Sequence, residues 1–180
     1  MAGAMMGPAK LTDGTRVHVR WMIRRDIPEV LAIEADLFEN HWDEEDFLRV
    51  LRERNCIGVV EECDDRVVAF IVYELHTTRL QILNFAVQRE LHRRGMGRVM
   101  IEGMIRKLAP QRRARLVLKI RETNLDAQMF FRAMVFRAMS VLKGFYDDSD
   151  EDAYVFQFRL GNPGQPAAEL PFAAVRRFGK

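Results

Sequence analysis

A glycine-punctuated turn between an apolar run and an amphipathic segment constrains the fold of this chain more than any other feature. The turn reads His92-Arg93-Arg94-Gly95-Met96-Gly97, and apolar residues then recur at helical spacing up to Pro110. A helix that begins after such a turn can hold an anion, because its first N–H groups lack intrahelical partners and its dipole favours negative charge. Flanking arginines add positive charge. The feature therefore predicts an α/β unit that binds a phosphorylated ligand.

Two common phosphate-binding motifs do not fit this turn. A dinucleotide fingerprint needs three glycines in G-x-G-x-x-G, and a Walker loop needs G-K-[ST]. Neither pattern is present around Gly95 and Gly97. Taken alone, the turn could equally be a helix start with an arginine-rich solvated face, so its function depends on the rest of the chain.

The remaining sequence alternates predicted helices and strands. Asp26 and Glu29 form a capping-box-like start for a helix that continues to Leu37, and a second helix is expected to begin at Asp43. Strands are predicted at 56–61, 66–75, 81–87, 115–120, 136–142 and 153–160, and a further helix at 124–134. The order of strand, two helices, three strands, helix, strand, helix and two strands predicts an α/β fold around one mixed sheet.

Length and composition are consistent with one folded domain. The chain has 180 residues, 48% of them hydrophobic, which is enough to bury a core. We expect a flexible N-terminal segment at 1–15, a domain at 16–160 and a C-terminal tail at 161–180. No apolar run approaches the roughly 18 residues of a membrane span, and the first ten residues lack a secretion signal, so a cytoplasmic location is expected. Cys56 and Cys63 lie outside metal or redox spacing, so no metal site is expected.

Three motifs in order resemble segments of the GNAT acetyltransferases, and the first two resemble the family's acetyl-CoA signature. Asn84-Phe85-Ala86-Val87 precedes Arg93-Arg94-Gly95-Met96-Gly97-Arg98, and Arg121-Glu122-Thr123-Asn124-Leu125-Asp126-Ala127 resembles the second part of the signature. The segment 144–154 is similar to the tail of the protein N-terminal acetyltransferases, in particular the RimI-like ribosomal-protein alanine N-acetyltransferases. The resemblance covers about residues 20–160. It implies a GNAT fold, a single mixed, splayed β-sheet with flanking helices.

The resemblance also implies a set of residues that bind the acetyl-CoA donor. The backbone of one strand would pair with the pantetheine arm and the acetyl carbonyl, at Phe85, Ala86 and Val87. Backbone amides of the turn would hold the pyrophosphate, at Arg93, Arg94, Gly95, Met96, Gly97 and Arg98. Asn124 would contact the cofactor near its thiol, and it could also serve as a helix N-cap. His92 stands where the family usually has Gln or Arg.

The catalytic positions depart from the family pattern. In RimI-like enzymes a glutamate acts as base and a tyrosine as acid, and these positions fall on Lys119 and Phe131. Phenylalanine has no proton to donate, and a lysine at its reference pKa of about 10.4 is protonated at neutral pH. Val135, where the family usually has glycine before Phe136, is a further departure.

Three residues could take over the acid and base roles. Tyr146 could protonate the leaving thiolate or orient the peptide, or it could be a half-buried strand-end aromatic. Glu39 could hold or deprotonate the amine through water, or it could be a solvated loop acid. Lys119 could act as a base only if burial and its neighbours lowered its pKa strongly, whereas a strand lysine usually extends into solvent.

The net charge of +2 conceals two blocks of opposite sign. Residues 89–121 contain 11 Lys and Arg against 2 Asp and Glu, a balance of +9. Residues 29–65 contain 13 Asp and Glu against 3 Arg, a balance of −10. We expect the basic block to meet the phosphates of acetyl-CoA. We expect the acidic block, with the acids at 147–152, to face a positively charged acceptor.

These observations predict an acetyl-CoA-dependent N-acetyltransferase that acts on the N-terminal α-amine of a protein, a ribosomal protein being the leading candidate. The amine would attack the thioester directly in a ternary complex. Neither DNA nor a membrane is an expected partner, and the chain could be a monomer or a homodimer. Two alternatives stay open: a GNAT enzyme that acts on a small-molecule amine or lysine side chain, and a catalytically degenerate acyl-CoA-binding module.

Overall fold

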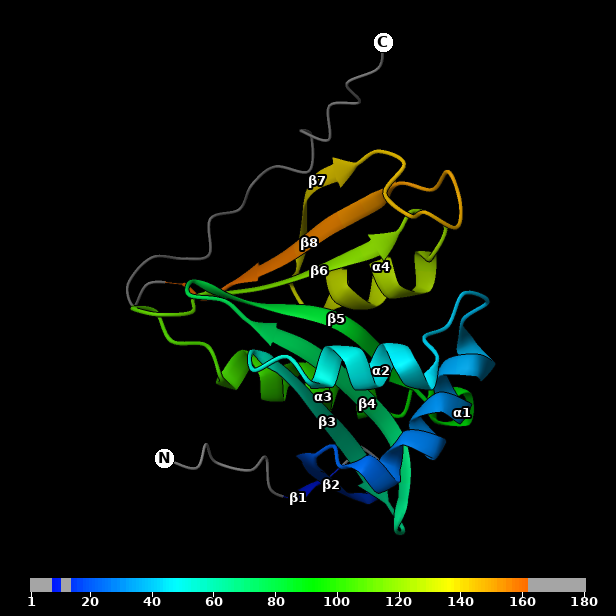
Figure 1. The fold of residues 1–180 in the computed structure, drawn as a ribbon. Coiled ribbons are helices and arrows are strands. Elements are labelled where there is room, and N and C mark those ends of the chain that lie inside the picture. The colour runs from blue at the N-terminus through cyan, green and yellow to red at the C-terminus, as the bar shows by residue number, and fades with distance from the viewer. Residues whose placement is uncertain (1–7, 11–13, 162–180) are drawn as a thin grey trace.

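An eight-stranded mixed sheet organises the protein, described by a computed structural model over residues 8–10 and 14–161 (Figure 1). The strands lie in the order β1-β2-β3-β4-β5-β6-β8-β7, and every neighbouring pair is antiparallel except β5 and β6. The strands are β1 Pro8–Lys10, β2 Arg16–Trp21, β3 Cys56–Cys63, β4 Arg66–Leu75, β5 Arg79–Val87, β6 Arg115–Arg121, β7 Arg137–Leu142 and β8 Ala153–Arg159. The predicted mixed-sheet fold is confirmed, as is the predicted order of strands and α-helices from β2 onward.

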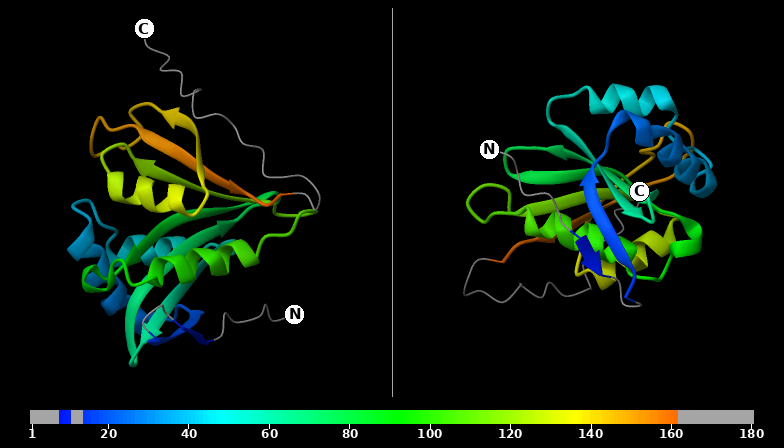
Figure 2. Two further views of the ribbon diagram at one scale, coloured as in Figure 1. Left: turned by 180° about the vertical axis from the view of Figure 1, so that it is seen from behind. Right: turned by 90° about the horizontal axis from the view of Figure 1, so that it is seen from below.

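Helices cover both faces of this sheet, as the views in Figure 2 show. The α-helices are α1 Ile27–Leu37, α2 Glu44–Leu51, α3 Met96–Arg106 and α4 Leu125–Ala133, and short 3₁₀ turns lie at η1 Arg24–Asp26 and η2 Arg89–Leu91. Side chains of α1 and α2 pack on Val60 and Val72, whereas α3 and α4 pack on Val59 and Ile71. Adjacent β3 residues thus point to opposite cores, because successive strand side chains alternate between faces.

The hairpin between β3 and β4 turns at Asp64 and Asp65, between two strands that the sequence predicts. Both residues have positive φ, 49° and 61°. Two consecutive residues of positive φ match the right-handed twist of the flanking strands, and aspartate tolerates this backbone better than most residues.

The start of α1 differs from the predicted capping box, although the helix itself is confirmed. Asp26 lies in the preceding 3₁₀ turn with helical backbone angles, so its side chain does not cap α1. Its carboxylate instead accepts two hydrogen bonds from Arg20, at 2.7 and 3.0 Å, and one from Ile23 N. Glu29 accepts from Val67 N on β4 at 3.0 Å. The carboxylates of Asp26 and Glu29 therefore bind partners from β2 and β4 and do not form the predicted capping box.

The predicted start of α2 at Asp43 is confirmed. Asp43 has extended backbone angles, and its Oδ1 accepts a hydrogen bond from Asp46 N at 2.8 Å. Phe47, one turn into the helix, is fully buried against Phe70.

The sheet extends further toward the N-terminus than expected. Pro8–Lys10, within the segment predicted to be flexible, pairs with Arg16–His18 as an edge strand. Apart from Gly161, the predicted C-terminal tail lies outside the described residues. No helix in the described part of the chain is long and apolar enough to cross a membrane.

Candidate active site

The parallel strands β5 and β6 are paired over only part of their length and then diverge. Their ladder runs from Arg79↔Arg115 to Gln81↔Val117 and then ends, although β5 continues to Val87 and β6 to Arg121. Figure 1 shows the resulting divergence, with the α1–α2 loop and the β7–β8 loop on either side of its open end. Strand backbone that faces such an opening can pair with an extended ligand, because its N–H and C=O groups lack a neighbouring strand.

The glycine turn lies at the end of β5, where the opening is widest. Gly95 adopts a left-handed backbone with φ of 96° and forms the N-cap of α3. Val99 N donates to Gly95 O at 3.0 Å, so the N–H groups of residues 95–98 precede the first intrahelical bond. Arg93, Arg94 and Arg98 are exposed around them. The predicted anion-binding geometry is present, because free N–H groups and arginines surround one helix start.

His92 fastens the turn to the strand. Its Nε2 lies 2.7 Å from the carbonyl oxygen of Val87, the last residue of β5. The histidine that departs from the family pattern therefore has a local role, and its contact is with the chain's own backbone.

Gly97 allows a close approach between α3 and two aromatic rings. A Cβ at this position would lie 3.2 Å from the Phe130 ring and 3.3 Å from the Phe85 ring. Phe131 packs in the same aromatic cluster and is only 2% exposed. The position that carries the family's acid is thus a buried hydrocarbon that packs α4 against the sheet.

Asn124 occupies the N-cap of α4, as one of the two readings of this residue predicts. Its Oδ1 accepts a hydrogen bond from Ala127 N at 3.0 Å. The side-chain amide Nδ2 makes no hydrogen bond to another described residue. Capping uses the oxygen and leaves the nitrogen free to donate, so the cap does not conflict with a ligand contact.

Two of the three candidate catalytic residues lie on the same side of the opening. Lys119 is exposed on β6, and its Nζ lies 4.2 Å from the centroid of the Phe145 ring. Tyr146, the next residue, is half-buried, and burial raises the pKa of its phenol. Glu39 lies on the α1–α2 loop, is exposed, and makes no ion pair with a described residue. The structure does not bring Glu39 into contact with Lys119 or Tyr146.

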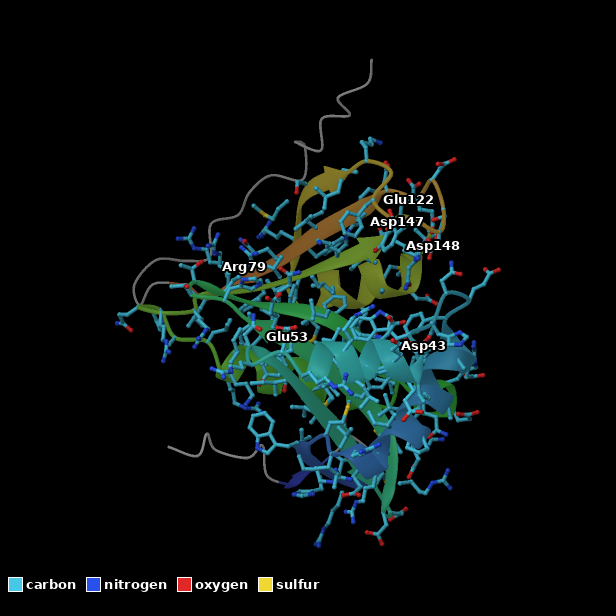
Figure 3. The ribbon with its side chains drawn as sticks, viewed as in Figure 1. Asp43, Glu53, Arg79, Glu122, Asp147 and Asp148 are labelled. Carbon is cyan, nitrogen blue, oxygen red and sulfur yellow. The ribbon has the colours of Figure 1, made fainter. Side chains whose placement is uncertain are left out.

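The acids at 147–152 are less available to an acceptor than their sequence suggests. Asp148 and Glu151 bind Arg121, at 2.5 and 2.7 Å, and Asp152 binds Lys143. Asp147 and Asp150 remain exposed without an ion pair to a described residue. Figure 3 shows Glu122, Asp147 and Asp148 together at this end of the sheet. Three acids of the run are thus paired with two cations of the chain itself, and the expectation that the run faces the acceptor stays a prediction.

A buried carboxyl that sequence reasoning missed lies behind the opening. Glu34 on α1 is 2% exposed, and its Oε1 accepts from Asn84 Nδ2 at 2.8 Å and Trp42 N at 3.1 Å. Burial raises the pKa of this carboxyl. A signal was present, because Glu34 continues the apolar face formed by Ile27 and Val30, where an acid needs a partner.

No group of His, Cys, Asp and Glu among the described residues could hold a metal ion. Cys56 and Cys63 form no disulfide, and burial raises the pKa of the Cys56 thiol. Cys56 begins β3, outside the segments that border the divergence. Cys56 therefore does not belong to the candidate site, whereas Cys63, at the end of β3, packs in a cluster with Val87 and Met96.

A sheet that opens between two parallel strands, with an anion-binding helix start at the opening, defines a class of transferases that use a coenzyme A thioester. A family model described as Acetyltransferase (GNAT) family matches residues 25–136, well over half of the chain. The chain belongs to the GNAT family, which takes its acetyl group from acetyl-CoA.

Individual relatives are more distant. The chain is 26% identical over 132 residues to ribosomal protein bS18-alanine N-acetyltransferase of Salmonella typhimurium, covering 72% of this chain and 88% of the relative. The crystal structure of the Escherichia coli ribosomal-protein-S18-alanine N-acetyltransferase superposes with a TM-score of 0.72 at 22% identity, over 87% and 99% of the two chains. Arabidopsis thaliana NAA60 in complex with acetyl-CoA gives 0.70 at 18% identity, over 80% and 99%. The structural likenesses show the fold.

Proposed function

We propose that this chain transfers the acetyl group of acetyl-CoA to the N-terminal α-amine of a protein, with a ribosomal protein as the leading acceptor. The observation that carries the proposal is the divergence after Gln81↔Val117, which has an anion-binding turn at one strand end and Tyr146 beside the other. The name of the Salmonella relative supports the acceptor class.

In this proposal the donor lies along β5. The backbone of Phe85, Ala86 and Val87 pairs with the amides of the pantetheine arm, because the β6 ladder has ended before these residues. The amides of residues 93–98 bind the pyrophosphate, and the three exposed arginines supply positive charge. Asn124 contributes its free Nδ2 near the thiol.

The acceptor enters as a neutral amine. An α-amine has a pKa of about 7.7 to 8.0, so a useful fraction is unprotonated at neutral pH without a strong base. The ammonium of Lys119 at this side of the opening lowers the pKa of a nearby amine further, because two like charges repel. This role differs from that of the family's glutamate and does not require Lys119 to lose its own proton.

The reaction is a direct displacement in a ternary complex. The amine nitrogen attacks the thioester carbonyl, the C–N bond forms and the C–S bond breaks. The phenol of Tyr146 protonates the departing thiolate, and the raised pKa of the phenol keeps it protonated at neutral pH. The surplus proton of the amine leaves through water near Glu39 and the phenolate recovers a proton from solvent.

A panel of acceptors tests the proposal. The purified chain is incubated with acetyl-CoA and peptides with free N-termini, N-terminally blocked peptides that contain lysine, polyamines or aminoglycosides. Acetylation confined to free peptide N-termini supports the proposal, whereas transfer to small amines alone would replace it with a small-molecule acetyltransferase. Tyr146→Phe should lower kcat about tenfold or more, because general-acid catalysis contributes at least that much.

One observation favours a second candidate, a catalytically degenerate acyl-CoA-binding module. Phe131, at the position of the family's acid, is sealed in the aromatic cluster and has no proton to donate. Tight binding of acetyl-CoA without release of CoA in the presence of any peptide would establish that candidate. A large gain of activity in Lys119→Glu would then show that the family's base was lost.

A further inference from the structure

Arg121, the last residue of β6, holds the β7–β8 loop (residues 143–152) in place. Its Nη1 donates to Ser149 Oγ at 3.0 Å and to Glu151 Oε2 at 2.7 Å, and its Nη2 donates to Asp148 Oδ2 at 2.5 Å. These hydrogen bonds raise the pKa of the guanidinium, so it stays charged throughout any assay range. One side chain thus binds three loop residues that lie 27 to 30 positions away.

The same guanidinium covers the face of the Tyr146 ring. Its central carbon Cζ lies 3.8 Å from the ring centroid, and the Phe145 ring packs edge-on against Tyr146 at 5.2 Å. No hydrogen bond joins the Tyr146 hydroxyl to another described residue. Contacts with Arg121 and Phe145 therefore hold the Tyr146 ring in place, while its hydroxyl makes no hydrogen bond within the described residues.

The loop also closes on itself around these contacts. Phe145 N donates to Glu151 O at 3.0 Å, Ser149 N donates to Tyr146 O at 3.2 Å, and Thr123 Oγ1 hydrogen-bonds Glu151. Lys119, two residues before Arg121 and on the same side of the strand, covers the Phe145 ring. Two consecutive aromatic residues of the loop thus lie on two cations of β6.

We propose that Arg121 is a positioning residue for acetyl transfer, which acts by holding Tyr146 at the divergence of β5 and β6. This inference rests on the proposed function, in which Tyr146 protonates the thiolate. Because β6 is one wall of the opening, a guanidinium anchored at its end fixes the phenol relative to the donor. Lysine cannot replace it, since a single ammonium lacks the planar fork that reaches several acceptors and stacks on a ring.

A double-mutant cycle distinguishes positioning from general stability. Steady-state kinetics with a peptide acceptor would be measured for the wild type, Arg121→Ala, Tyr146→Phe and the double variant. Each single change should lower kcat about tenfold or more, and the double variant should be no more than about twofold worse than the poorer single one. The dissociation constant of acetyl-CoA should change less than about twofold, because the pyrophosphate site is untouched. Fully multiplicative losses in kcat would overturn the proposal, as would an Arg121→Lys variant with wild-type kcat.

Variants of the loop residues that bind Arg121 test the proposal even if Arg121→Ala does not fold. Asp148→Asn and Glu151→Gln each weaken one contact of the guanidinium without changing β6, and each should lower kcat about threefold or more. Arg66→Ala is the matched control, because it removes an exposed ion pair between Arg66, at the β3–β4 hairpin, and Glu29. Its kcat should equal that of the wild type. Wild-type kcat in both loop variants would overturn the proposal.

Hydrogen exchange separates this inference from the proposed function. The amides of Phe145 and Ser149 should exchange about tenfold faster in Arg121→Ala than in Arg66→Ala, because their loop loses its anchor. Unchanged exchange rates would overturn the proposal that Arg121 holds the β7–β8 loop, whatever the activity of the variant. If the wild type acetylates no peptide but exchange is faster in Arg121→Ala as expected, the proposed function fails, whereas the role of Arg121 in holding the β7–β8 loop is retained.

Discussion

Glu34 Oε1 accepts a hydrogen bond of 2.8 Å from Asn84 Nδ2 and thereby joins α1 to β5 across 50 residues of sequence. The same oxygen accepts from Trp42 N, in the connection between α1 and α2. Asn84 directly precedes the strand segment proposed to bind the donor. One buried carboxyl therefore joins the α1–α2 loop, which is proposed to lie on the acceptor side, to the strand that is proposed to bind the donor.

Glu34→Ala should destabilise the protein and loosen the acceptor side. The change leaves Trp42 N and Asn84 Nδ2 without an acceptor in the interior, which costs about 2–4 kcal/mol in the free energy of unfolding. We also expect the KM for the peptide to rise about tenfold or more, with a smaller change in acetyl-CoA affinity. Urea unfolding and steady-state kinetics measure these effects. Glu29→Ala, on the same helix, is the control, and an equal rise in its KM would argue against the tie.

Gly95→Ala should weaken the binding of acetyl-CoA. A side chain at φ of 96° costs about 1–2 kcal/mol, and relief of that strain would turn the N–H groups of the anion site. Calorimetry should show a dissociation constant at least about tenfold higher. Gly14→Ala introduces similar strain at φ of 87° away from the turn, so it should lower stability but not affinity. Unaltered affinity in Gly95→Ala would show that the turn does not hold the donor.

Val135→Gly should stabilise the protein, which is unusual for a large-to-small change. Val135 has φ of 65° and ends α4, where Phe136 N donates to Phe131 O and Val135 N donates to Arg132 O. This helix ending favours glycine, and a left-handed β-branched residue is strained by about 1 kcal/mol or more. The valine side chain is 59% exposed, so little packing is lost. Thermal unfolding should show a higher Tm for Val135→Gly than for Val135→Ala, which retains Cβ, and the reverse order would refute the explanation.

Glu61→Gln should remove a pH dependence of stability. Glu61 is fully buried in β3 with no partner for either oxygen among the described residues, and burial raises its pKa to about 8. The unfolded chain ionises near 4.5, so the folded state loses stability as pH rises from about 4.5 to 8 and levels off above that range. At pH 7 the loss is on the order of 3 kcal/mol.

Denaturant unfolding between pH 4.5 and 8 measures this slope. The wild type should lose stability relative to Glu61→Gln across the range, because the amide cannot ionise. Glu45→Gln, which changes an exposed residue of α2, should retain the wild-type slope. Parallel curves for wild type and Glu61→Gln would show that the carboxyl is solvated or paired.

Features that depend on local sequence could be predicted well. The start of α2 at Asp43 and the glycine turn before α3 each follow from the preferences of a few adjacent residues. The positive φ of Val135 is consistent with the glycine that the family has there. These devices are specified within about five residues, so the pattern and the structure agree.

Features that depend on distant partners could not be predicted. Asp26 follows the capping pattern but binds Arg20, and Asp148 belongs to an acidic run but binds Arg121. In both cases the fold of the sheet brings the arginine close to the acid, and the local sequence pattern does not specify that arrangement. The proposed acceptor side of the candidate site depends on such distant partners, whereas the geometry of the donor side lies mostly in one strand, one turn and one helix start.

Mass spectrometry of a single reaction tests the central claim most directly. The chain is incubated with acetyl-CoA and an equimolar pair of peptides, one with a free N-terminus and no lysine, the other N-terminally blocked with one lysine. The account predicts one added acetyl group on the first peptide, matched by an equal amount of free CoA, and none on the second. Acetylation of the lysine peptide alone, or bound acetyl-CoA without any transfer, would contradict it.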